Sequence, residues 1–424
     1  MSGIIQMHAL RHVVEDTRHP MARHYSTKDF FRQMPNALLA RYFATHGLLT
    51  DFDFTAIKET KIDALFDAWM ELPEAARVRL ESDLREICDM ACPVGTQAIL
   101  DEAEFHLDDD RLAEFRDGLM ALPGHHERAM TVFLDHANLW RGATRFHHAD
   151  TLSYWRKRKN LPRVAAAVDP ESLRSLEAAI RCYYRVSEGR GQHCRVEPYR
   201  RGDRDYFFAF PEDYAQQSVE WEGDDFSVRP HHPAFEVVFV YRRSEGTLDL
   251  YVPGNRKAVE PLQGIFAEHI LKCEDLPADP ADTRVYDLGA LRRREFAFSW
   301  APESGIESVA VSRLRLSLHS PRNAKLIVEA DTKHRPDAVY DLLETLAPVF
   351  PGHSYLVTQV GIAARIKPNT HSASKQVNFT VSFPNSCSLK HDEVGLKLRA
   401  MLWASGIEPR EPEVLVDGEG QTKP

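Results

Sequence analysis

Cysteine is scarce in this 424-residue sequence, with six residues scattered between Cys88 and Cys387. There is no CxxC pair, and zinc ribbons and thioredoxin-like motifs depend on such pairs. The spacing also lacks the density of a disulfide framework. We therefore expect a protein of a reducing compartment, and the cytoplasm is the simplest location.

Common nucleotide-binding and catalytic motifs are missing as well. We find no GxxxxGK[ST] loop and no GxGxxG that follows a strand and opens a helix, so no nucleotide cofactor is expected. A GxSxG elbow and the protein-kinase motif set are also absent. These absences favour a binding role over a catalytic one.

Long hydrophobic runs and excess positive charge are two further absences. Because no 18 consecutive residues are apolar, no membrane span is expected. The first 20 residues lack an apolar core of signal-peptide length. The formal net charge is −10, from 53 basic and 63 acidic residues. This excludes nucleic-acid binding through a globally basic surface, although a local basic patch remains possible.

The residues that are present predict an α+β protein. Hydrophobic residues make up 43% of the chain and charged residues 27%, which is typical of globular domains. Helical periodicity predicts an all-helical domain over residues 26–162, and strand patterns predict an antiparallel-sheet domain over 231–407. A linker helix and short strands occupy 163–230. We expect a flexible lead at 1–25 and a disordered tail at 408–424.

Prolines and glycines mark the expected helices of the first domain. One helix begins at Pro35, a second passes through Ile62, and a third begins at Pro73. Three more are predicted at 94–106, 110–122 and 124–139. In the linker, Asp169 and Pro170 are typical of the first positions of a helix.

The sheet domain consists of three tandem strand–strand–helix units, at 235–271, 309–346 and 354–404. The sequence leaves open whether these units share one sheet. Period-2 alternation predicts one apolar face and one polar face. The polar face carries four basic residues that we consider candidates for nucleic-acid binding, namely Arg313, Arg315, Lys325 and Arg365. The alternative is a face that is solvated or covered by the helical domain.

A basic stretch at residues 154–159, called the seam here, closes the expected helical domain, next to the strand-rich part of the chain. It holds the densest positive charge in the chain, preceded by two aromatic residues. Its members are Tyr154, Trp155, Arg156, Lys157, Arg158 and Lys159. The cations could bind phosphates while an aromatic ring stacks on a base. Alternatively, acidic residues of the same chain, such as those at 108–110, neutralise them.

Histidine is frequent, with 20 residues, and several lie near carboxylates in the helical domain. Glu102 and His106 have the i,i+4 spacing that places two ligands on one helix face. The full pool of candidate metal ligands is Glu102, His106, Asp135, His136, His147 and Asp150. A divalent metal is the one cofactor that we consider. The alternative is that these histidines are surface or capping residues.

Three functional hypotheses follow. The first is a non-catalytic scaffold-like subunit of a bacterial multi-protein system, of the kind found with mobile elements or antiviral defence. It would bind DNA or RNA, and a protein partner is expected. The second is a metal-dependent hydrolase or nuclease that uses the histidine and carboxylate pool. The third is a structural component of an oligomer.

Overall fold

The computed structural model describes residues 25–254, 256–274, 276, 285–318, 324–367 and 373–408. Apart from Tyr25 and Glu408, the expected lead at 1–25 and tail at 408–424 lie outside the described residues. The chain forms two compact units. Unit 1 comprises Met1–Leu100 and Asp108–Thr144, and unit 2 comprises Asp101–Leu107 and Arg145–Pro424. This division falls before the boundary that the sequence suggested at Pro162.

Helices dominate the first part of the chain, as expected. Their bounds are α1 Thr27–Arg32, α2 Asn36–Thr45, α3 Asp63–Met70, α4 Glu74–Met90, α5 Pro93–His106, α6 Asp109–Ala121, α7 His125–Asp135 and α8 Ala137–Thr151. Pro35 and Pro73 occupy the N-cap positions of α2 and α4. The buried ring of Phe31 lies 5.7 Å from that of Trp69 in the core of unit 1.

The helix expected at 124–139 is wrong in one respect, because the chain leaves the helical conformation at His136. Its backbone angles are φ −133° and ψ 51°, so α7 ends at Asp135. The carbonyl of His136 then accepts hydrogen bonds from the amides of Leu139 and Trp140 and opens α8. No proline or glycine marks this break, so residue patterns do not reveal it.

The described strands confirm the antiparallel sheet and the α+β class. Ten of them form one sheet in the order β2-β3-β6-β7-β1-β12-β11-β10-β8-β9. Their bounds are β1 Trp155–Arg158, β2 Cys194–Arg201, β3 Arg204–Pro211, β6 Val237–Arg242, β7 Thr247–Tyr251, β8 Ile306–Leu318, β9 Lys325–Glu329, β10 Tyr355–Ile366, β11 Lys375–Ser382 and β12 Ser386–Cys387. A separate hairpin pairs β4 Gln216–Glu222 with β5 Asp225–His231.

All three strand–strand–helix units are present, and they share the sheet. Their helices are α10 Val259–His269, α11 Ala338–Leu346 and α12 Glu393–Ala404. The linker helix is α9 Pro170–Glu188, with Asp169 as its N-cap. Pro261 is the third residue of α10. A helix has no intrahelical partner for the amides of its first turn, so proline is tolerated there.

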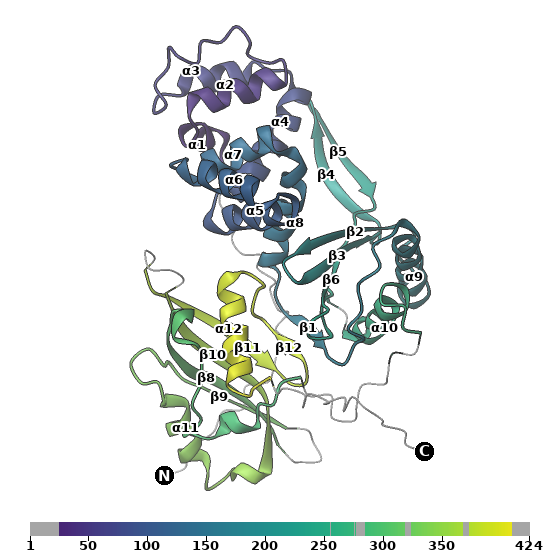
Figure 1. The fold of residues 1–424 in the computed structure, drawn as a ribbon, viewed down its shortest axis with the longest axis vertical. Helices are drawn as coiled ribbons and strands as arrows, with labels where there is room; N and C mark the ends of the chain where they lie inside the picture. The colour runs from purple at the N-terminus through teal and green to yellow at the C-terminus, as the bar shows by residue number, and fades with distance from the viewer. Residues whose placement is uncertain are drawn as a thin grey trace, which may run out of the picture. The chain divides into compact units, whose positions relative to one another are not determined.

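Helices cover opposite faces of the two halves of the sheet. α9 and α10 pack on one face, against Phe207, Phe239 and Leu250. α11 and α12 share a core with Val381 and Cys387. Cys387 is paired with Trp155 in register, and Lys157, two residues further, is paired with Asp249, the neighbour of Leu250. Because side chains alternate along a strand, Lys157 and Asp249 lie on the α12 face and not on the α9–α10 face. Figure 1 shows the ribbons of β1, α9, α10 and α12.

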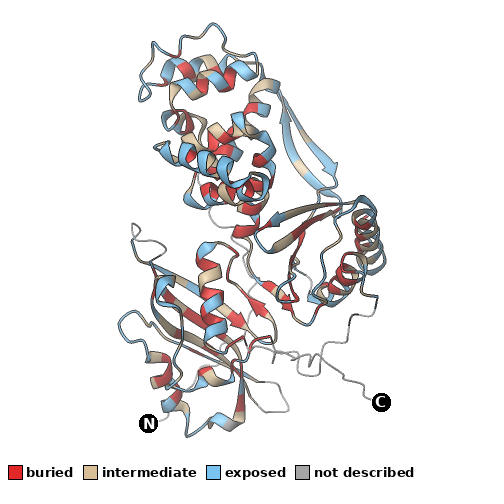
Figure 2. Ribbon diagram, viewed as in Figure 1, coloured by how far each residue is buried: buried red, intermediate tan, exposed pale blue. Residues whose placement is uncertain are grey.

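Burial follows this layered arrangement (Figure 2). The central strands of the sheet are largely buried, whereas β4 and β5 are largely exposed. Within the described ranges, no helix combines the length and the apolar character needed to cross a lipid bilayer.

Candidate anion-binding cleft

A cavity of about 1030 Å³ lies in unit 2, on the sheet face that α12 flanks. We call it the anion cleft. Ten ionisable side chains line it: Lys157, Lys159, Arg163, Arg204, Arg242, Glu245, Asp249, His391, Arg399 and Glu408. Six of them are lysine or arginine and three are carboxylates. With His391 neutral, the lining therefore carries an excess of three positive charges.

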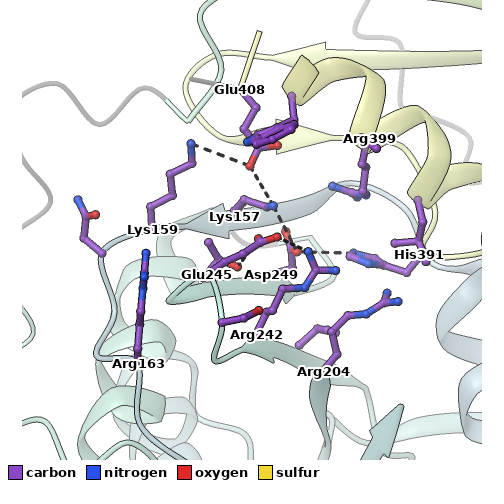
Figure 3. A pocket seen from close by; sticks show the side chains of 17 residues that line it. Lys157, Lys159, Arg163, Arg204, Arg242, Glu245, Asp249, His391, Arg399 and Glu408 are labelled. Atoms are coloured by element: carbon purple, nitrogen blue, oxygen red, sulfur yellow. Dashed lines mark hydrogen bonds and ion pairs between the residues drawn. The ribbon is translucent and has the colours of Figure 1, made fainter. Parts of the chain in front are cut away.

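The cleft brings together distant parts of the chain (Figure 3). Lys157 comes from β1, Asp249 from β7, and Arg204 from the first position of β3. Arg399 projects from α12, and His391 precedes that helix. Strand alternation places the sheet residues on one face, because Lys157 and Asp249 are directly paired in register.

Lys157 is a buried cation with acidic partners. Its Nζ lies 3.0 Å from Glu408 Oε1 and 4.0 Å from Asp249 Oδ2. Burial lowers the pKa of Lys157, but the attraction of Asp249 and Glu408 outweighs burial, so the pKa is raised overall. Lys159 Nζ lies 3.9 Å from the same Glu408 oxygen. Lys157 is therefore charged, and Glu408 partly neutralises both lysines.

His391 is buried beside these charges and is held neutral. It is 2% exposed, and within the described structure neither ring nitrogen has a hydrogen-bond partner. Burial lowers its pKa well below the usual value, and Arg399, Arg204, Lys157 and Arg242 lower it further. A neutral imidazole can donate one hydrogen bond and accept another.

Arg204 and Arg399 have buried guanidinium N–H groups that lack an acceptor among the described residues. Within the described residues, Nε and Nη1 of each are buried without a hydrogen-bond partner. Arg399 Nη2 donates to the carbonyl of Leu389 at 2.8 Å. Arg204 Nε lies 3.8 Å from Asp203 Oδ1, outside hydrogen-bond distance. A desolvated donor costs free energy until it meets an acceptor, and an anionic oxygen is the strongest acceptor for a guanidinium.

The side chains of the seam residues in β1 alternate between the two faces of the sheet. Lys157 and Lys159 line the anion cleft. Trp155 is 1% exposed and its ring packs edge-on against His391 at 4.6 Å, so it is not accessible to a base. Tyr154 is 61% exposed.

The other two seam residues, Arg156 and Arg158, are paired with Leu250 and Leu248, and thus project towards the α9–α10 face. Burial lowers the pKa of Arg156, and the nearby Arg256 lowers it further.

The four basic candidates on the open sheet face lie outside the cleft. Arg313 and Arg315 on β8 are half-buried, whereas Lys325 and Arg365 are exposed. Arg313 Nε is 3.6 Å from Glu329 Oε2. Arg365 forms a similar ion pair with Glu307 at 3.4 Å. Neighbouring carboxylates therefore balance part of this charge, as in the alternative of a solvated face.

Of the candidate metal ligands, two contact each other and two form ion pairs with arginines. His106 Nε2 lies 2.9 Å from Glu102 Oε1, as their helical spacing indicates. Asp150 pairs with Arg201 at 2.7 Å, and Asp135 pairs with Arg41.

The two remaining candidates are His136, whose ring lies 5.0 Å from that of Phe115, and His147 on α8. In the described part of the chain, no three His, Cys, Asp or Glu side chains are placed to hold one metal ion. The pool therefore supplies no common centre there.

Sequence reasoning missed the other ionisable residues of the cleft, namely Arg163, Arg204, Arg242, Glu245, Asp249, His391, Arg399 and Glu408. One signal was available. Asp249 interrupts the apolar strand TLDLYV, and Arg399 interrupts the apolar face of LKLRAMLW. A charge at a core position of an element has to be paired or functional, because burying it alone is costly.

We compared the chain with protein-family models, with curated proteins and with solved structures, and found no match.

Proposed function

We propose that the protein is a non-catalytic nucleic-acid-binding subunit and that the anion cleft holds phosphates of the bound strand. The observation that carries this proposal is the convergence of Arg204, Arg399 and neutral His391 on one cavity with excess positive charge. Arginine N–H groups match phosphate oxygens in geometry and charge.

The charge of the whole chain bears on how a strand would bind. The net charge of −10 repels a polyanion at long range, so affinity has to come from a local group of cations. The cleft provides such a group, with Lys159 and the exposed Arg163 beside its more buried arginines. Binding is therefore expected to depend steeply on salt.

A binding role suits the cleft better than acid–base catalysis. His391 has a pKa well below the usual value, which makes it a weak proton acceptor near neutral pH. Lys157 is held in its charged form by Asp249 and Glu408, so it is a weak proton donor. These groups are suited to hydrogen bonding and charge stabilisation.

The test is a titration of the full chain with labelled single-stranded DNA and RNA at low and high salt. The double substitution of Lys159→Gln and Arg163→Gln should weaken binding about tenfold at low salt and reduce the log–log salt slope by roughly 1 to 2. The matched control is Arg195→Gln on β2, which removes a 75% exposed arginine that does not line the cleft.

The result that would overturn the proposal is equal binding by the double variant and the control, or no binding by the unaltered chain at low salt. Duplex DNA serves as a third ligand, since a cleft of this size admits a strand more readily than a duplex.

The expectations of a protein partner, of a cytoplasmic location and of a bacterial multi-protein system belong to the same proposal. The β4–β5 hairpin supports the first of these. Val219, Trp221, Phe226 and Val228 of the hairpin are each more than half exposed, at 62%, 68%, 57% and 51%. Exposed apolar groups of this kind are common at interaction sites.

A further inference from the structure

The inner part of the anion cleft differs from its rim in burial. Lys157, His391 and Arg399 are 7%, 2% and 8% exposed, whereas Lys159 is half-buried and Arg163 exposed. A phosphate within a strand carries chain on both sides, and both sides would have to follow it into the cavity. A phosphate at the end of a strand can enter with chain on one side only.

The carboxylates of the cleft indicate where an anion would sit. Glu408 is hydrogen-bonded to Lys157, and Glu245 to Arg242. Both carboxylates therefore neutralise the cations on their own side of the cavity. Arg204 and Arg399 keep buried N–H groups without hydrogen-bond acceptors among the described residues. Both also act electrostatically on His391, and Asp249 Oδ2, 3.9 Å from His391 Nε2, places one carboxylate beside the same ring.

The number of donors fits a monoester better than a diester. Nε and Nη1 of the two arginines supply four nitrogens, and the imidazole of His391 can supply a fifth. A phosphodiester has two free oxygens and one negative charge. A phosphate monoester has three acceptor oxygens and a charge of about −1.5 to −2 at neutral pH.

We propose that the anion cleft takes the terminal phosphate monoester of a single nucleic-acid strand, held between Arg204 and Arg399 beside His391. Trp403 lies one helical turn after Arg399 and lines the same cleft with 42% of its surface exposed. Its ring is placed to stack on the terminal base. This inference rests on the proposed function and specifies which part of the strand the protein recognises.

The experiment compares one labelled oligonucleotide sequence in three forms: 5′-phosphate, 3′-phosphate, and hydroxyl at both ends. Binding to the full chain is measured by fluorescence anisotropy at near-neutral pH. One of the phosphorylated forms should bind at least about tenfold more tightly than the hydroxyl form, since several charge-assisted hydrogen bonds are gained. A free mononucleotide and inorganic phosphate should compete only weakly, because they lack the contacts of the strand with the rim.

Substitutions then identify the residues that recognise the phosphorylated end. Arg204→Gln and His391→Gln should reduce the preference for the phosphorylated end to less than about threefold. Arg195→Gln should keep the full preference. Arg399→Gln is a second test from the opposite wall, provided that its thermal unfolding matches that of the unaltered chain.

Three outcomes would overturn the inference. Equal, salt-sensitive binding of all three forms would remove end recognition and leave the proposed function standing. If none of the three oligonucleotide forms binds, both end recognition and the proposed function are contradicted. A mononucleotide that competes as strongly as the phosphorylated strand would assign the cleft to a small phosphorylated ligand instead.

Discussion

His391 is a titratable side chain that the fold keeps from titrating in its usual range. Its ring packs on Trp155 and its Nε2 lies 3.9 Å from Asp249 Oδ2, while the positive charges of four cleft residues lower its pKa. Protonation would add a charge to a buried and already positive site. The neutral form is therefore the stable one, and the ring is kept as a hydrogen-bonding group.

The free energy of unfolding should depend on pH because the folded state keeps His391 neutral. The pKa of His391 is lowered in the folded state, so the folded state binds fewer protons than the unfolded state, whose histidine pKa is about 6.5. Stability is therefore expected to fall as the pH drops below about 6.5, by at most about 1.4 kcal/mol per pH unit from this residue. The free energy of unfolding of the unaltered chain and of His391→Gln should be measured by urea denaturation between about pH 5.5 and 7.5.

The difference in the free energy of unfolding between the unaltered chain and His391→Gln should change with pH. As the pH falls, the variant should become more stable relative to the unaltered chain. Asp150 acts in the opposite direction, because burial raises its pKa to about 6 in spite of Arg201, but it is common to both proteins and cancels. A gap that stays constant across this range would show that His391 is not held neutral.

At the level of elements, α10 packs against one face of the sheet and stabilises its strands. Phe266 of α10 is fully buried, and its ring centroid lies 5.2 Å from that of Phe207 and 5.1 Å from that of Phe239. These two residues come from β3 and β6, the strands that also carry Arg204 and Arg242. The packing on one face of the sheet thus holds the strands whose other face lines the cleft.

Phe266→Ala should lower the free energy of unfolding by about 3–5 kcal/mol, since it removes a large buried ring and leaves a cavity. Urea denaturation followed by circular dichroism measures the change. Val186→Ala on α9, where the side chain is 82% exposed, is the control and should alter stability by less than about 0.5 kcal/mol. A small effect of Phe266→Ala would mean that α10 is not an essential support of these strands.

On the scale of the whole molecule, β1 joins the two halves of the sheet. It pairs with β7 on one side and with β12 on the other. Because the helices of the two halves cover opposite faces, the anion cleft opens where one helical layer ends and the other begins. The β4–β5 hairpin stands apart, since its strands pair with each other and not with the ten-stranded sheet.

Replacing residues 216–231 with a short Gly–Ser linker should therefore leave the rest of the chain intact. An isolated two-stranded hairpin contributes little stability, so we expect a change of less than about 1 kcal/mol. Strand binding should also be unchanged, because no cleft residue lies in the hairpin. Thermal unfolding and anisotropy check both points, and a loss above about 2 kcal/mol would show that the hairpin stabilises a core.

The sequence by itself determined the class of the fold and most of its elements. Alternation of apolar residues located the three strand–strand–helix units, and the proline and aspartate signals placed the starts of α2, α4 and α9. These signals are local, since each depends on residues within one or two turns or strand repeats. The break at His136 carried no such signal and was missed.

Only the tertiary structure decided which charged side chains of the seam are buried and which residues they pair with. As a run of cations, the seam predicts a solvated surface, yet Lys157 is buried and pairs with Glu408, which is 251 residues away. Local periodicity contains no information on which strands become neighbours, so it cannot show that β1 lies beside β7 or that α12 flanks its face. The anion cleft exists because this long-range pairing brings Arg204, His391 and Arg399 to one cavity, where burial and mutual repulsion set their chemistry.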